Sequence, residues 1–281
     1  MSRLKACFEN LKTRQRTALI PYIAAGDPNP DITIDLMHAL VAAGADVIEL
    51  GVPFSDPMAD GPVIQKASER ALVYGTSLAD VIEMVATFRQ TNHDTPVVLM
   101  GYLNPIEIMQ YGTFAEHAAA AGVDGVLTVD IPPEEAKAYV PELKEKGLDP
   151  IFLLSPTTTT ERMQEICKFA SGFVYYVSVK GVTGTSSLDI SAVTDKVNII
   201  KSITDLPVGV GFGIKNAETA AAIGNISDAV VVGSALVILF DQKAPDNAFI
   251  IIDISYLLSS WRDEFDSNAY MNLGTAIVTY K

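Results

Sequence analysis

The sequence predicts an α/β protein folded as a closed (β/α)8 barrel, the TIM barrel. Between residues 18 and 232, short apolar runs alternate eight times with stretches of helical periodicity, a pattern typical of a parallel sheet covered by helices. No Pro- or Gly-rich linker interrupts the alternation, and residues 1–281 suit a single barrel domain. A doubly wound open sheet has the same alternation and is the alternative fold.

Each strand is predicted from a short run of mostly β-branched or other apolar residues beside turn residues. The predicted strands are 18–24, 47–51, 96–100, 125–129, 151–154, 173–177, 207–210 and 229–232. The predicted helices are 2–14, about 31–44, 62–72, 77–90, 105–121, 133–146, 159–170, 191–203, 216–223, 234–240 and 250–261. This order gives the barrel an extra N-terminal helix and extra helices in some βα loops.

Proline and hydroxyl residues mark several of the helix starts. Pro62 suits the first turn of a helix, where its missing N–H is not needed, and Ser77 or Thr76 suits the cap of the next helix. The helix at 105–121 is predicted to be interrupted near Gly112. Residues 264–281 follow no helical period, so we expect an irregular C-terminal tail.

Charge and cysteine usage limit the partners and the compartment. A formal net charge of −14 argues against nucleic acid and anionic membrane surfaces as partners. The first residues lack the apolar core of a signal peptide, and the apolar runs at 229–240 and 249–258 are shorter than the roughly 20 residues of a membrane span. Cys7 and Cys167 follow no spacing motif, so we expect reduced thiols and a cytoplasmic protein.

One acidic residue interrupts the second predicted strand. Because side chains alternate along a strand, Glu49 shares a face with Val47 and Gly51, opposite Ile48 and Leu50. If helices cover the face of Ile48 and Leu50, Glu49 points into the barrel. A carboxylate in that position needs a partner, or its pKa must rise.

The loop after this strand carries further acids, Asp56 and Asp60. The prolines that stiffen the loop are Pro53, Pro57 and Pro62. A carboxyl group inside the barrel and a second one on a stiff loop at the strand end suit acid/base chemistry. The alternative is a buried Glu49 bonded to the backbone beside a solvated acidic turn.

Glycines follow the last three predicted strands, at the ends where (β/α)8 barrels bind ligands. The segments are Lys180–Ser186, Gly209–Gly213 and Gly233–Ser234. Glycines let backbone N–H groups approach an anion, and the helix that begins at Ser234 adds its dipole. Three adjacent strand ends favour a phosphate site over ordinary turn glycines.

Apolar and aromatic residues at the strand ends are candidates for the wall of a pocket, although they can equally fill the barrel. They are Tyr22, Met100, Leu127, Val129, Leu153 and Phe212. Tyr175 alternates with Phe173 and Val177, so its hydroxyl is expected inside the barrel. That hydroxyl either serves the site or bonds to the backbone.

Metal, Schiff-base and nucleotide-loop chemistry have little support. The histidines, His38, His93 and His117, show no ligand spacing, so no metal is expected. Lys180 lies beyond its strand in a loop, a poor place for a desolvated amine. The sequence has no Walker A loop, and Gly209–Ile214 lacks the spacing of a dinucleotide-binding turn.

The segment Glu49–Pro62, ELGVPFSDPMADGP, closely resembles the signature of the tryptophan synthase α subunit family. Further motifs match that family in order over roughly residues 5–240. They are Pro21–Gly26, Gly101–Pro105, Asp130–Pro133, Leu154–Thr157, Gly181–Gly184, Gly211–Ile214 and Gly233–Ser234.

The resemblance implies aldol-type cleavage of indole-3-glycerol phosphate to indole and glyceraldehyde 3-phosphate, without metal or Schiff base. Glu49 is then the general acid/base, Asp60 accepts a hydrogen bond from the indole N–H, and Tyr175 positions the glycerol chain. The positions that match the phosphate site are Gly184, Gly213, Gly233 and Ser234. The resemblance also implies that the loop around Thr183 closes over the substrate, contacts Asp60 and excludes water.

The partner implied by the resemblance is a β subunit in an αββα assembly that channels indole. Pyridoxal phosphate belongs to that subunit, and no cofactor is expected in this chain. The matching surface residues are Pro53, Phe54, Ser55, Asp56, Asn104 and Pro132. The alternatives are another phosphosugar-binding barrel, such as an isomerase, and a non-catalytic barrel that only binds and activates a β-type partner. The presence of both Glu49 and Asp60 argues against the second alternative.

Overall fold

Eight parallel strands form a closed barrel in which β1 pairs with both β2 and β8. The computed structural model describes residues 2–178, 189–211, 213–243 and 247–278. The strands are β1 (Ala18–Ala24), β2 (Ile48–Gly51), β3 (Val97–Gly101), β4 (Gly125–Thr128), β5 (Asp149–Leu154), β6 (Val174–Val177), β7 (Val208–Gly211) and β8 (Ala229–Val232). The predicted (β/α)8 barrel is confirmed, and the open sheet is excluded because every strand has two neighbours.

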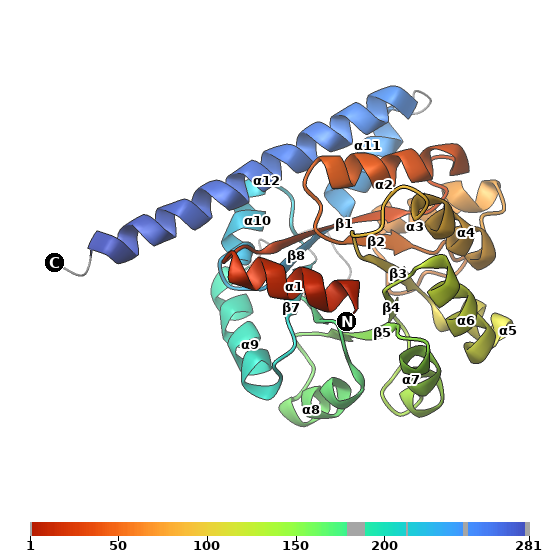
Figure 1. The fold of residues 1–281 in the computed structure, drawn as a ribbon, viewed down its shortest axis with the longest axis horizontal. Helices are drawn as coiled ribbons and strands as arrows, with labels where there is room; N and C mark the ends of the chain where they lie inside the picture. Colours follow the sequence, from red (N-terminus) through yellow and green to blue (C-terminus); the bar gives the residue numbers. More distant parts are fainter. Residues whose placement is uncertain (1, 179–188, 212, 244–246, 279–281) are drawn as a thin grey trace.

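Helices surround the barrel and connect its strands (Figure 1). They are α1 (Arg3–Thr13), the 3₁₀ turn η1 (Pro30–Ile32), α2 (Thr33–Ala42), α3 (Pro62–Val73), α4 (Leu78–Phe88), α5 (Leu103–Met109), α6 (Tyr111–Ala121), α7 (Ala136–Glu145), α8 (Thr160–Phe169), α9 (Ile190–Ile203), α10 (Ala217–Gly224), α11 (Ser234–Lys243) and α12 (Asn247–Val278). The predicted N-terminal helix is α1. The extra helices appear after β2, as α3 and α4, and after β3, as α5 and α6.

Strand side chains divide between the barrel interior and the shell of helices. Val47 packs inside the barrel with Leu127, whereas Ile48 and Leu50 pack under the helices. Helix α1 closes the amino-terminal end of the barrel, where its Phe8 ring lies 5.7 Å from the ring of Phe173 (centroid to centroid). Side chains therefore fill the interior at the amino-terminal end of the barrel. The loops at the carboxyl ends of the strands remain available to form a ligand site.

Local signals fix several helix boundaries. Helix α3 begins at Pro62, and α4 is capped by a reciprocal pair in which the Ser77 N–H donates to Asp80 at 2.8 Å. The break predicted near Gly112 is confirmed, and it lies at Gln110, whose φ of 71° separates α5 from α6. A residue in the left-handed region cannot continue a right-handed helix, so the break lies where the backbone changes hand.

The C-terminal segment is helical, so the irregular tail predicted at 264–281 is wrong. Helix α12 runs to Val278 and extends past the barrel (Figure 1), and residues 279–281 lie outside the described part. The buried residues of its first half are Ile250, Ile254, Leu258, Trp261 and Phe265. This packing nucleates the helix, which then propagates at little cost. A segment that leaves the barrel surface has no core-facing side, so its helix shows no apolar period.

One of the two apolar runs of the sequence is divided between two short elements, and the other, at 249–258, lies within α12. Residues 229–240 are divided between β8 and the start of α11. In the described ranges no single helix has both the length and the hydropathy of a membrane span, and α3 and α4 reach that composition only when joined across a bend of 91°. Cys7 and Cys167 are free thiols, as expected.

Candidate active site

Glu49 lies on the inner face of β2, at the carboxyl end of the barrel. The residue is 1% exposed, and its Oε1 has no hydrogen-bond partner among the described residues. Burial raises the pKa of Glu49 to about 8, and the negative charge of Asp60 acts in the same direction. The Glu49 side chain therefore carries a proton at neutral pH and can act as an acid.

Asp60 lies at the end of the loop between β2 and α3 and is 8% exposed. Burial raises its pKa to about 6, while a hydrogen bond from Tyr102 lowers it. The electrostatic effect of Asp60 on Glu49 places both carboxyl groups in one site. At neutral pH the site thus offers one protonated acid and one ionised hydrogen-bond acceptor.

Tyr102 is a site residue that the sequence did not indicate. Its hydroxyl donates to Asp60 Oδ2 at 3.0 Å and accepts the Ala59 N–H at 3.0 Å. The signal that could have revealed it is its place directly after β3, since residues at the carboxyl ends of barrel strands tend to face the ligand.

Two tyrosines fill the mouth of the barrel above glycines. Tyr22 is the register partner of Glu49 between β1 and β2, and a Cβ built at Gly51 would overlap its hydroxyl. Tyr175 on β6 covers Gly211 on β7 in the same way. Burial, together with the nearby carboxylates, raises the pKa of both tyrosines well above the ordinary value. Both hydroxyls therefore stay protonated and can donate hydrogen bonds in the site.

The apolar wall residues lie at two depths. Met100, Val129 and Leu153 are half-buried at the mouth and pack against the barrel interior. Leu127 has no exposed surface and lies within the interior cluster, so it fills the barrel beneath them. Met100, Val129 and Leu153 thus offer the apolar surface that a flat aromatic ligand needs.

The last strand ends offer backbone groups to an anion. The carbonyl of Gly233 accepts the N–H of Val237 at 3.0 Å, so Gly233 caps α11. Ser234 is the first residue of that helix, where N–H groups without intrahelical partners and the helix dipole stabilise negative charge. Gly213 has a φ of 77°, which favours glycine. The predicted residues Thr183, Gly184 and Phe212 lie outside the described residues.

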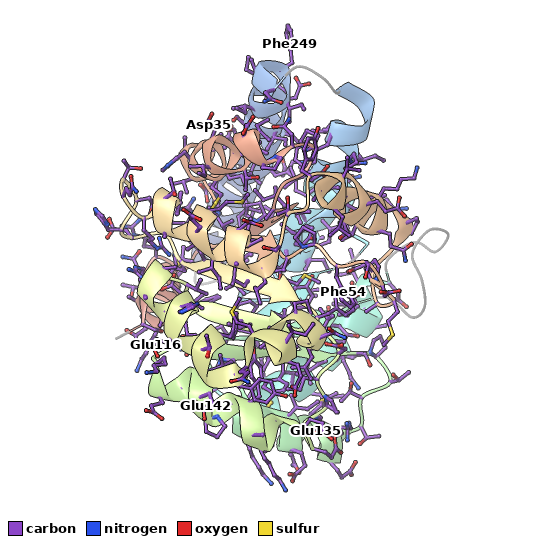
Figure 2. The ribbon with its side chains drawn as sticks, turned by 90° about the vertical axis from the view of Figure 1, so that its right-hand side faces the viewer. Asp35, Phe54, Glu116, Glu135, Glu142 and Phe249 are labelled. Atoms are coloured by element: carbon purple, nitrogen blue, oxygen red, sulfur yellow. The ribbon has the colours of Figure 1, made fainter. Side chains whose placement is uncertain are left out.

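The residues of the predicted partner surface follow three neighbouring strands. Ser55, Asp56 and Asn104 are exposed, Phe54 and Pro132 are half-buried, and Pro53 is buried. Phe54, labelled in Figure 2, stacks on Tyr102 with ring centroids 5.0 Å apart, so the loop after β2 packs against the start of α5. Met58 on this loop and Ile108 on α5 are 81% and 80% exposed and were not singled out from the sequence.

Other parts of the described chain offer no competing centre for this chemistry. Within the described ranges no group of three His, Cys, Asp or Glu side chains is placed to hold a metal ion. A cavity of about 1000 Å³ lies at the amino-terminal end of the barrel, lined by α1 and by the loops before β7 and β8. The residues predicted for the site do not line it, and barrels of this kind bind their ligands at the opposite end, where the strands have their carboxyl ends.

Several known proteins similar to this chain share one description. Residues 8–261 match the family model described as tryptophan synthase alpha chain. The tryptophan synthase alpha chain of Marinobacter nauticus is 58% identical over 96% of this chain and 100% of its own length. That of Methylococcus capsulatus is 59% identical over 95% of this chain and 100% of its own length. The crystal structure of tryptophan synthase subunit alpha from Legionella pneumophila has 45% identity and a TM-score of 0.87, over 95% of this chain and 99% of that chain. The chain belongs to the tryptophan synthase alpha chain family and is a lyase of tryptophan biosynthesis.

Proposed function

We propose that this chain cleaves indole-3-glycerol phosphate to indole and glyceraldehyde 3-phosphate. The observation that supports the proposal is the pair of carboxyl groups in the barrel mouth, with Glu49 protonated and Asp60 ionised at neutral pH. Aldol-type cleavage at an indole ring needs a proton for ring carbon C3 and a negative group for the ring N–H. Glu49 and Asp60 supply these two functions.

Glu49 moves protons in a closed cycle. Its carboxyl group gives a proton to indole C3, and the resulting positive charge is shared with the ring nitrogen, whose N–H donates to Asp60. The Glu49 carboxylate then takes the proton of the hydroxyl on the carbon attached to C3. The carbon–carbon bond breaks, its electron pair restores the aromatic ring, and the hydroxyl carbon becomes the aldehyde. Glu49 ends the cycle protonated, as it began, so no external acid is consumed.

The remaining site residues hold the substrate. We assign the ring to the half-buried wall at Met100 and the glycerol hydroxyls to Tyr175. The proposed phosphate site consists of the backbone at Gly213, Gly233 and Ser234, with Gly184 added by the family resemblance. Thr183 is assigned to the loop over the substrate and Phe212 to the pocket wall. Backbone N–H groups at a helix N-terminus and at glycines can bind a phosphate without an overall positive charge on the protein. This mode of binding suits a chain of net charge −14.

We also propose a β subunit as the partner, in an αββα assembly that passes indole to pyridoxal phosphate held by that subunit. The supporting feature is the partner surface of Phe54, Ser55, Asp56, Asn104 and Pro132 beside the barrel mouth. Its exposed Met58 and Ile108 provide apolar area of the kind that is enriched in interface cores.

Release of indole from indole-3-glycerol phosphate tests the function. The purified chain is expected to release indole and aldehyde in equal amounts, and faster once a β subunit is added. An isomerase of the same fold would consume the substrate without releasing indole, and a non-catalytic barrel would leave the substrate intact in both assays.

A further inference from the structure

The Tyr102 side chain is hydrogen-bonded to the loop that carries Asp60, whereas a residue that only lines a pocket needs no such bonds. It is 5% exposed and lies between β3 and α5. Its hydroxyl makes two hydrogen bonds within the loop after β2, donating to the Asp60 carboxylate and accepting the Ala59 N–H, both at 3.0 Å. The hydroxyl thus fixes the backbone before Asp60 and the Asp60 side chain together.

The tyrosine ring is held in place on its other side. Phe54 stacks on it at 5.0 Å with an interplanar angle of 25°, and offset stacking of this kind restricts both rings. Tyr102 cannot swing away without breaking the stack. The position of its hydroxyl oxygen is therefore fixed by packing that does not involve Asp60.

The backbone of Asp60 is fixed by a separate set of contacts. Gln65 on α3 donates from Nε2 to the Asp60 carbonyl at 2.8 Å, and the Asp60 N–H donates to the Pro57 carbonyl at 3.1 Å. These bonds set the position of the main chain but leave the carboxyl torsion free. Across the described residues, the hydrogen bond that sets the direction of the Asp60 carboxylate is the one from Tyr102.

The same bond favours the charged form of Asp60. Burial raises the pKa of Asp60 to about 6, and the hydrogen bond from Tyr102 is the opposing influence. Burial and the charge of Asp60 raise the pKa of Tyr102 far above its ordinary value, so its hydroxyl remains a donor over the whole working pH range. A donor that cannot ionise stabilises the neighbouring carboxylate at every such pH.

We propose that Tyr102 is a positioning residue for Asp60: its hydroxyl aims the carboxylate into the site and stabilises the ionised carboxylate that receives the indole N–H. The catalytic consequence rests on the proposed function, whereas the effect on Asp60 itself does not. Tyr102 acts through Asp60 and takes no proton from the substrate.

The test replaces Tyr102 with Phe, which keeps the ring and its stack on Phe54 and removes only the hydroxyl. The control is Tyr139→Phe, because Tyr139 on α7 is 2% exposed and its hydroxyl is also hydrogen-bonded, to Thr128 at 3.2 Å, away from the proposed site. Carbon-13 NMR of labelled Asp carboxyls follows the titration of Asp60 in each protein. We expect the pKa of Asp60 to rise in Tyr102→Phe and to stay unchanged in Tyr139→Phe.

Kinetics supply the second readout. Loss of a hydrogen bond to a charged group should lower kcat/KM for indole release by roughly tenfold to a hundredfold in Tyr102→Phe. The loss should fall mainly on kcat, and the acidic limb of the pH profile should move to higher pH. In an Asp60→Asn background the same Tyr102→Phe change should cost less than about twofold, because residues that act as a unit are not additive.

Two results would overturn the inference: an unchanged Asp60 titration in Tyr102→Phe, or an equal loss of kcat/KM with and without Asp60. If the unmodified chain releases no indole, the proposed function fails. The NMR titration still decides whether Tyr102 controls Asp60 in that case.

Discussion

The hydroxyl of Tyr22 occupies the space where a side chain on Gly51 would lie. A Cβ built at Gly51 would overlap this hydroxyl and approach the ring carbons at 2.6 Å and 2.7 Å. Gly51 lies two residues after Glu49 on the same face of β2, and Tyr22 is the register partner of Glu49. The absence of a side chain at Gly51 therefore lets an aromatic ring cover the carboxyl group that the proposed chemistry needs.

Gly51→Ala is expected to displace Tyr22 and damage the site. A methyl group inserted into a packed region typically costs about 1–3 kcal/mol of stability, and the shifted ring should lower kcat/KM for indole release at least tenfold. Urea unfolding and the indole assay measure the two effects. Gly224→Ala is the control, because the nearest atoms to its Cβ lie at 3.7 Å. If Gly51→Ala behaved like Gly224→Ala, Tyr22 would not be held as described.

Glu49→Gln should abolish cleavage while substrate binding survives. The amide keeps the shape of the side chain but cannot give or take the proton, and such groups contribute roughly a hundredfold to ten-thousandfold in rate. Indole release measures the loss, and calorimetric titration with a glycerol phosphate measures binding. Glu116→Gln, on the outer helix α6, serves as the control. Near-normal turnover by Glu49→Gln would remove Glu49 from the mechanism.

The pH dependence of kcat/KM should be bell-shaped, with limbs at about 6 and about 8. Activity falls below the first limb because Asp60 gains a proton and no longer attracts the positive ring, and above the second because Glu49 loses the proton that it must donate. The two groups influence each other, so the limbs belong to the pair. In Asp60→Asn the acidic limb should disappear. A profile that rises steadily through pH 8 would show that ionised Glu49 starts the reaction.

Glu49 should also destabilise the fold at high pH. Its pKa is about 8 in the folded chain against an ordinary value of 4.5, so between these values the folded state binds more protons than the unfolded state. The stability contributed by Glu49 is fully present below pH 4.5 and is lost as pH rises through about 8, with a total on the order of 5 kcal/mol.

Urea unfolding at pH 5 and at pH 9 tests this linkage. Glu49→Gln should lose less stability than the unmodified chain between the two pH values, and it should be the more stable protein at pH 9. An identical decrease in both proteins would mean that Glu49 is ionised in the folded state at pH 7.

Gly233→Val should weaken the binding of a glycerol phosphate. The Cβ itself fits, since the nearest atom, Tyr22 Cβ, would lie 3.4 Å away, but the added methyl groups reach the approach to the start of α11. Gly233→Ala is the matched control and should bind more tightly than the valine variant. Calorimetric titration with glycerol phosphate gives both affinities. Equal affinities in the two variants and the unmodified chain would place the phosphate elsewhere.

Structural features that depend on residues close together in the sequence, such as strand alternation and helix starts, were predictable. The period-two alternation at Val47–Gly51 placed Glu49 inside the barrel, and Pro62 and Ser77 marked the starts of helices α3 and α4. The tail could not be predicted in this way. Its helix is nucleated by Ile250 to Phe265 on the barrel surface, and the extension beyond that surface carries no pattern to detect.

The sequence by itself determined the alternation of strands and helices, the inward direction of Glu49 and the family signature, because each depends on local periodicity or on residue order. Only the tertiary structure decided that Tyr102 holds Asp60 and that Tyr22 covers Gly51. Both contacts join neighbouring strands or the residues that follow them, so pairing of β1 with β2 and of β2 with β3 creates them. Burial in the assembled barrel removes water from Glu49 and Asp60, and desolvation is the main cause that raises the pKa of each.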